Sequence, residues 1–96
     1  MRSKPALKPK TDATDRELRE ILQDVLGLAP QQVARFGPDS GLFGHLPELD
    51  SMAVAGLLTE VEDRFDIVIE DDEVESEMLE TYGALLEFVR SKTAES

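Results

Sequence analysis

The sequence of 96 residues contains no cysteine, which excludes disulfide bonds, thiolate nucleophiles and cysteine-ligated metals. Its longest uninterrupted apolar run, Met52 to Leu58, has seven residues even when Gly56 is counted. A membrane-spanning helix needs about 20. The first residues also lack the apolar core of a secretory signal. We therefore expect a cytoplasmic protein with no place in a membrane.

Basic residues are scarce, with 10 lysines and arginines against 21 acidic residues and a net charge of -11. Four of the ten lie within the first ten positions, so residues 11–96 hold six basic and 21 acidic residues, a net of -15. Such a domain repels nucleic-acid phosphates and anionic lipid surfaces and is steered toward basic protein surfaces. The sequence thus predicts protein partners with basic or mixed basic and apolar docking surfaces, although acidity that only confers solubility is the simpler reading.

The chain is long enough for one small domain, which buries only about 60–65% of its unfolded surface. A deep enclosed active site is hard to build on such a thin core. We expect three parts, a flexible basic N-terminal tail over 1–13, a folded domain over 14–92 and a frayed C-terminus over 93–96. We also expect a monomer.

Three amphipathic helices are predicted. The first begins at a capping box formed by Thr14 and Glu17 and ends at Gly27. The second runs from about Ser51 to Phe65, and the third begins at Thr81, a favourable N-cap. Their apolar faces follow helical spacing, and the second is expected to bury a stripe of Val54, Leu58, Val61 and Phe65.

Residues 28–50 are broken by six glycines and prolines and form a long loop, which apolar side chains pin to the core. A short helical turn is expected over 72–77. The predicted fold class is therefore all-α, a small bundle of three main helices with a short third helical turn and a long loop between the first two helices.

Ser51 is the candidate site, because it stands where the long loop meets the first turn of a helix. A hydroxyl there is reachable by another protein, and a phosphate esterified to it faces unpaired backbone amides and the positive end of the helix dipole. The carboxylate of Asp50 is placed to orient a metal or a phosphate donor. Asp and Ser are also common N-caps, and capping alone accounts for the two residues taken by themselves.

The surroundings of Ser51 resemble the acyl carrier protein family. The segment LPELDSMAVAGLLTEVEDRFDIVIEDDEV (46–74) has a D-S-M motif opening a helix, a phenylalanine fourteen residues later in E-x-x-F, and an apolar linker that leads into an acidic turn. The resemblance covers residues 14–92. It implies an acyl-carrier fold, a 4'-phosphopantetheine arm attached to Ser51 by a phosphopantetheinyl transferase, and Asp50 as the motif neighbour.

The resemblance also implies that the protein is no enzyme but holds acyl groups as thioesters and presents them to acyl-loading and acyl-accepting enzymes. Partner recognition is assigned to the start of the second helix and its approach, at Leu49, Met52, Val54, Ala55 and Glu60. An aminoacyl or peptidyl carrier and an unmodified acidic helical adaptor for a basic protein are the alternatives.

The helix after Ser51 departs from the fatty-acid carriers, because residues 53–56 are Ala-Val-Ala-Gly where those carriers are more acidic. Together with the approach over 42–48, it resembles stand-alone carriers of bacterial exopolysaccharide or exosortase-type gene clusters. We therefore expect a specialised pathway of lipid or exopolysaccharide biosynthesis.

Two other arrangements are disfavoured. A triad of Ser51 and His45 with an acid has no G-x-S-x-G elbow and no evident oxyanion hole. The acidic run over 70–77 lacks the glycine and the spacing of an EF-hand loop. We read it as a solvated face and expect no catalytic residue and no metal site.

Overall fold

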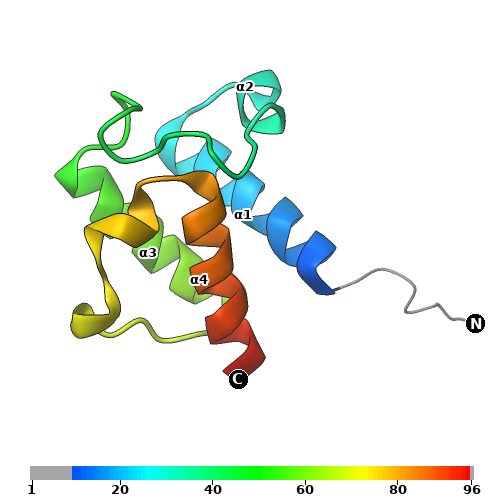
Figure 1. Cartoon of the computed structure of the whole chain (residues 1–96), viewed down its shortest axis with the longest axis vertical. Helices are drawn as coiled ribbons and strands as arrows, with labels where there is room; N and C mark the ends of the chain where they lie inside the picture. The colour runs from blue at the N-terminus through cyan, green and yellow to red at the C-terminus, as the bar shows by residue number, and fades with distance from the viewer. Residues whose placement is uncertain (1–9, 96) are drawn as a thin grey trace, which may run out of the picture.

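The computed structural model describes residues 10–95. Three long helices pack side by side, and a long loop crosses one end of them (Figure 1). The described part contains no strand, only one isolated bridge between Gly41 and Thr81. The predicted all-α bundle is confirmed, with the elements α1 (Lys10–Leu26), α2 (Pro30–Ala34), α3 (Ser51–Phe65), η1 (Asp71–Glu73), η2 (Ser76–Leu79) and α4 (Tyr82–Glu95), η denoting a 3₁₀ helix.

The core lies between α1, α3 and α4 and is built from aliphatic side chains and one tyrosine. The expected stripe on α3 is only partly right. Of its four residues only Val61 is buried, while Val54, Leu58 and Phe65 stay half-buried, and the helix also buries Leu57. The fully buried side chains of the three helices are Leu18, Ile21, Leu22, Leu57, Val61, Tyr82, Leu85 and Val89. None of the helices within residues 10–95 combines the length and the hydropathy that a bilayer-spanning segment requires.

Both ends of the folded region extend beyond the predicted domain. α1 begins at Lys10, so residues 10–13 of the predicted tail are helical, and residues 1–9 lie outside the described part. The capping box is not formed, because Thr14 is buried inside the helix. The reason is that residues 10–26 contain neither glycine nor proline to stop the helix.

The C-terminus was predicted to fray from residue 93, but α4 continues to Glu95. Two contacts hold this end. The Thr93 hydroxyl donates to the Arg90 carbonyl oxygen at 3.0 Å, and the Lys92 ammonium donates to the Glu73 carboxylate at 2.8 Å.

The loop after α1 contains a short helix that the sequence patterns did not indicate. Gly27, with a φ of 69°, ends α1 in the left-handed conformation that glycine adopts without strain. Pro30 then opens α2, which is only five residues long and buries Val33. Leu28, Leu42 and Leu49 are also buried, so the loop is pinned to the core as predicted.

Arg19 of α1 binds the first part of this loop. Its guanidinium donates to the carbonyl oxygens of Val33 at 2.6 Å and Phe36 at 2.9 Å. Its third donor, Nε, contacts the Asp15 carboxylate at 3.0 Å, and its face lies 4.6 Å from the centroid of the Tyr82 ring. The Tyr82 hydroxyl donates to Asp15 in turn, and its burial together with that bond raises the Tyr82 pKa. One arginine thus connects α1, the loop and α4.

The second part of the loop is fixed to the chain around the start of α4. The Leu42 amide donates to Glu80 O at 2.8 Å, and the Gly83 amide donates to Pro38 O at 3.0 Å. A Cβ atom at position 83 would lie 2.7 Å from that same carbonyl oxygen, so only glycine permits the approach. The loop that leads to Ser51 is therefore held by Arg19 of α1 and by the backbone around the start of α4.

Replacing Arg19 with methionine keeps the apolar stem but removes every donor. We expect Arg19→Met to lower the free energy of unfolding by about 1–3 kcal/mol, because two loop carbonyls lose their donors. Arg16→Met, at an exposed position on the same helix, is the control and should change stability by less than about 0.5 kcal/mol. Urea unfolding followed by circular dichroism measures both, and equal effects would contradict the role given to Arg19.

Candidate functional site

Ser51 is the first residue of α3 and is exposed. Asp50 is the N-cap, in extended conformation, and its carboxylate accepts the Ala53 amide at 2.8 Å. The Asp50 carbonyl oxygen accepts the Val54 amide at 2.9 Å. These bonds use the third and fourth amides of the helix, whereas those of Ser51 and Met52 have no acceptor among residues 10–95. Two free donors and the positive end of the dipole lie beside the hydroxyl.

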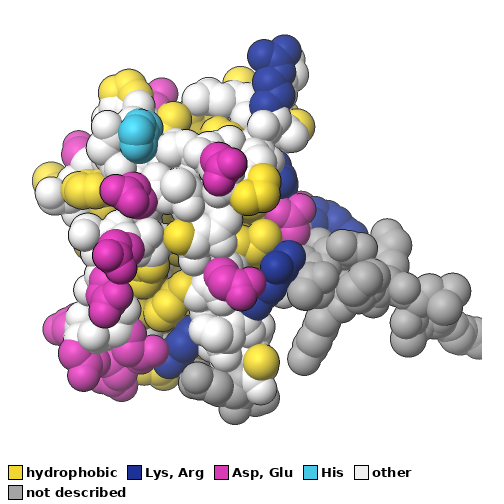
Figure 2. Space-filling model, viewed as in Figure 1, with side chains coloured by type: hydrophobic (Ala, Val, Ile, Leu, Met, Phe, Trp, Pro, Cys, Tyr) yellow, Lys and Arg dark blue, Asp and Glu magenta, His cyan; other side chains and the backbone are white. Residues whose placement is uncertain are grey.

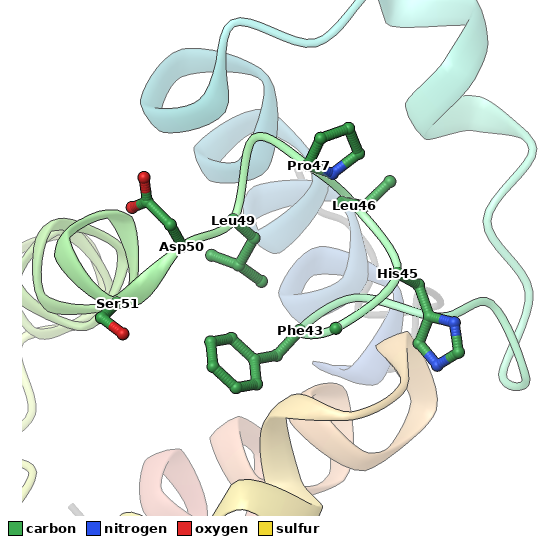
Figure 3. A pocket seen from close by; sticks show the side chains of 8 residues that line it. Phe43, His45, Leu46, Pro47, Leu49, Asp50 and Ser51 are labelled. Carbon is green, nitrogen blue, oxygen red and sulfur yellow. The ribbon is translucent and has the colours of Figure 1, made fainter.

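Two open grooves meet at Ser51. The first, of about 590 Å³, lies between the start of α3 and the loop, with apolar walls from Phe43, Leu46 and Leu49. Figure 3 shows the Phe43 ring and the Leu49 side chain beside the Ser51 hydroxyl. His45 lies on the other side of the loop and well apart from Ser51, so the two form no catalytic pair.

The second groove, of about 510 Å³, runs along α3 away from Ser51. Its α3 wall follows helical spacing and includes the half-buried Val54 and Leu58, and its opposite wall carries Ile69 and Val74. The predicted core stripe on α3 is therefore in part the wall of a groove. The sequence pattern indicates only that these positions are apolar, and it cannot distinguish a core position from one in a groove wall.

Two carboxylates fix the far wall of this α3–η1 groove. Glu62 on α3 accepts the Ile69 amide at 2.7 Å, and Glu73 in η1 accepts the Lys92 ammonium at 2.8 and 3.0 Å. The ammonium of Lys92 lowers the pKa of Glu73 below its ordinary value, and the Glu70 amide adds to that effect. The linker over 67–70 therefore has a defined position.

The predicted recognition residues are not equivalent. Met52 is 85% exposed, Ala55 is exposed, and Val54 lines the α3–η1 groove. The assignment of Leu49 to partner contact is wrong, because its side chain is only 2% exposed and belongs to the core. Glu60 is half-buried and held by the Arg64 guanidinium at 2.7 Å.

Arg64 is a residue that the sequence patterns did not single out. It contacts Asp24 at 2.6 Å, Glu60 at 2.7 Å and Glu17 at 3.1 Å, and so joins α3 to α1. These carboxylates, Asp24 first, raise its pKa further above its ordinary value. Within residues 10–95 no three acidic or histidine side chains are arranged to hold a metal ion, either around Arg64 or in the run over 70–77.

Two substitutions of Asp50 separate the contribution of its helix cap to stability from that of its negative charge. We expect Asp50→Ala to lower the free energy of unfolding by about 0.5–2 kcal/mol, because the Ala53 amide loses its acceptor. Asp50→Asn keeps an N-cap oxygen and should cost less than about 0.5 kcal/mol. Thermal and urea unfolding test the pair, and an alanine variant as stable as the asparagine variant would rule out the cap.

The contact between Glu73 and Lys92 predicts a dependence of stability on pH. Because the folded-state pKa of Glu73 is lowered, its contribution is fully present above the unfolded value of about 4.3 and is lost as the pH falls through the folded value. We expect Glu73→Gln to be less stable than the parent at about pH 7, and the difference to shrink toward about pH 3.

Urea unfolding at several pH values measures this difference. Glu80→Gln is the control, since Glu80 is exposed and makes no ion pair within residues 10–95. A gap between Glu73→Gln and the parent that stays constant with pH would contradict the assignment.

The chain is similar to known proteins in sequence and in structure. Residues 16–89 match the sequence model of a family described as "phosphopantetheine attachment site". The chain is 40% identical to a holo acyl carrier protein from Nitrosomonas europaea whose solution structure is known. The two superpose with a TM-score of 0.75, over 83% of this chain and 95% of the other. A search of curated protein sequences gave no match.

Proposed function

Because the chain belongs to the acyl carrier proteins of the phosphopantetheine-attachment family, we propose that Ser51 is the residue that bears its 4'-phosphopantetheine group. The observation that carries this proposal is the position of Ser51, which is exposed at the start of α3 where two grooves meet. A carrier of this family is not an enzyme, so reactivity of the serine toward substrates is not required.

The residues around Ser51 fit a phosphodiester. The free amides of Ser51 and Met52 point out of the start of α3, where a negatively charged group is favoured. Asp50 uses one carboxylate oxygen for the cap, through Oδ1. Its other oxygen has no donor among residues 10–95 and is available to a metal or to the phosphate donor on the transferase. Capping and attachment therefore use different atoms of the same turn.

The modification is a phosphoryl transfer from coenzyme A, which a phosphopantetheinyl transferase catalyses. The Ser51 oxygen forms a bond to the phosphorus next to pantetheine, the pyrophosphate bond breaks, and adenosine bisphosphate leaves with the bonding electrons. The hydroxyl proton passes to a base of the transferase. The exposed position of Ser51 lets a second protein reach it.

The arm supplies a terminal thiol, which holds an acyl group as a thioester and which this cysteine-free chain otherwise lacks. The α3–η1 groove begins at Ser51 and is apolar along Val54, Leu58, Ile69 and Val74. Burial of hydrocarbon against such a wall is favourable by about 0.8 kcal/mol for each methylene. The groove therefore favours an aliphatic acyl cargo over an aminoacyl or peptidyl one.

The role that we propose is a specialised one in lipid or exopolysaccharide biosynthesis in the cytoplasm, and its only support is that the surface beside Ser51 departs from the acidic helix of the fatty-acid carriers. No charged residue follows Ser51 on α3 until Glu60, and Met52 offers a large exposed apolar side chain. Partner enzymes then need an apolar docking surface next to their basic residues. A partner that recognises only acidic groups on its carrier would need basic residues alone. Met52, Val54 and Ala55 remain the proposed contact residues.

Modification at Ser51 is tested by intact mass. After incubation with coenzyme A and a broad-specificity phosphopantetheinyl transferase, the parent chain should gain the mass of one phosphopantetheine group, and Ser51→Ala should gain none. Ser76→Ala is the matched control, since Ser76 is also exposed and opens a helix. It should be modified like the parent.

Two outcomes would contradict the proposal. One is a Ser51→Ala chain that still gains the group, which would place the attachment elsewhere. The other is a parent chain that gains nothing while a known carrier in the same reaction is modified. That result would favour an unmodified acidic adaptor.

A further inference from the structure

A third groove lies between η2 and α4 and is distinct from the two at Ser51. Its floor is apolar and consists of Met78, Ala84 and Phe88, and its volume is about 440 Å³. Its rim carries three glutamates, Glu75, Glu77 and Glu87. None of these residues lines either groove at Ser51.

The rim carboxylates are available for contact. Glu75 and Glu77 are exposed and make no ion pair within residues 10–95. Glu87 is 74% exposed and has only a long contact to Arg90, at 3.6 Å. The nearby Lys92 ammonium is bound to Glu73, outside the groove. Figure 2 shows acidic side chains next to exposed apolar ones on the face that carries η2 and α4.

We propose that this η2–α4 groove is a docking site for a basic amphipathic segment of a partner protein. The apolar side of the segment packs on Met78, Ala84 and Phe88, and its lysines or arginines pair with the rim glutamates. The charge of the groove selects this occupant over a second copy, a lipid surface and nucleic acid. A second copy of the chain is as acidic as the first, and lipid headgroups or nucleic acids are anionic.

This site has a functional consequence. The η2–α4 groove shares no residue with the grooves at Ser51, so a partner segment confined to it does not occupy their walls. The carrier can then stay attached to one protein while another works at Ser51. Such a tether raises the effective concentration of the carrier near the second enzyme, without any new contact at the arm.

The test uses the full chain carrying Ser51→Ala, so its result does not depend on the attachment proposal. The probe is a synthetic helical peptide of leucine and lysine with all leucines on one face, and binding is followed by amide NMR shifts. We expect the largest shifts at η2 and along 84–91 of α4. A peptide with serine in place of leucine should bind at least about tenfold more weakly, because the apolar contact is lost.

Charge reversal distinguishes peptide binding by the groove glutamates from peptide binding by the net charge of the whole molecule. Glu75→Lys/Glu77→Lys should raise the Kd about tenfold. Glu20→Lys/Asp63→Lys changes the net charge equally at exposed helix positions outside the groove. It should raise the Kd by less than about threefold.

Several results would overturn the proposal. Equal losses in the two double variants would mean that bulk charge alone binds the peptide, and shifts centred on the start of α3 would place the site at Ser51. Groove shifts that depend on protein concentration without peptide would identify a second copy as the occupant. The last such result is a difference in NMR shift, without peptide, between the groove amides of a Lys4→Glu/Lys8→Glu chain and those of the parent. That difference would identify the chain's own basic N-terminal segment as the occupant of the groove.

Discussion

Arg19 donates to the carbonyl oxygens of Val33 and Phe36 while its guanidinium lies against the Tyr82 ring and contacts Asp15. The loop that follows α1 is long and rich in glycine and proline, so ordering it costs conformational entropy. The donors of Arg19 and the amide contacts around the start of α4 offset that cost. They hold the loop that leads to Asp50, whose cap begins α3.

The start of α3 combines two requirements in one turn. The helix needs a cap, which Asp50 supplies to the Ala53 amide, and the amides of Ser51 and Met52 stay free for the phosphate ester that we propose there. Further along α3, Val54 and Leu58 are half-buried because they face a groove and not another helix. The same helix therefore supports the core with one side and offers an apolar path from Ser51 with the other.

Local signals allowed a correct prediction of α3 from Ser51 to Phe65 and of Thr81 as the cap of α4, where its hydroxyl accepts the Ala84 amide at 3.2 Å. The start of α1 was misplaced because a strong cap sequence at Thr14 did not interrupt a stretch that continues as helix. The roles of Arg19 and Arg64 were not predicted, since the partners that join each arginine to another segment lie far away along the chain. Val33 is 14 residues from Arg19, and Glu17 is 47 residues from Arg64. Leu49 looked like a recognition residue, and only its burial shows that it is core.

The proposed attachment is one covalent bond at the Ser51 oxygen, and proteolysis followed by tandem mass spectrometry of the modified parent chain locates it directly. After cleavage following Glu48, which separates Ser40 from Ser51, the phosphopantetheine group should be released on fragmentation from the peptide that contains Ser51 and from no peptide that lacks it. A modified peptide without Ser51 would contradict the account, because the arm would then begin away from the amides and grooves at the start of α3.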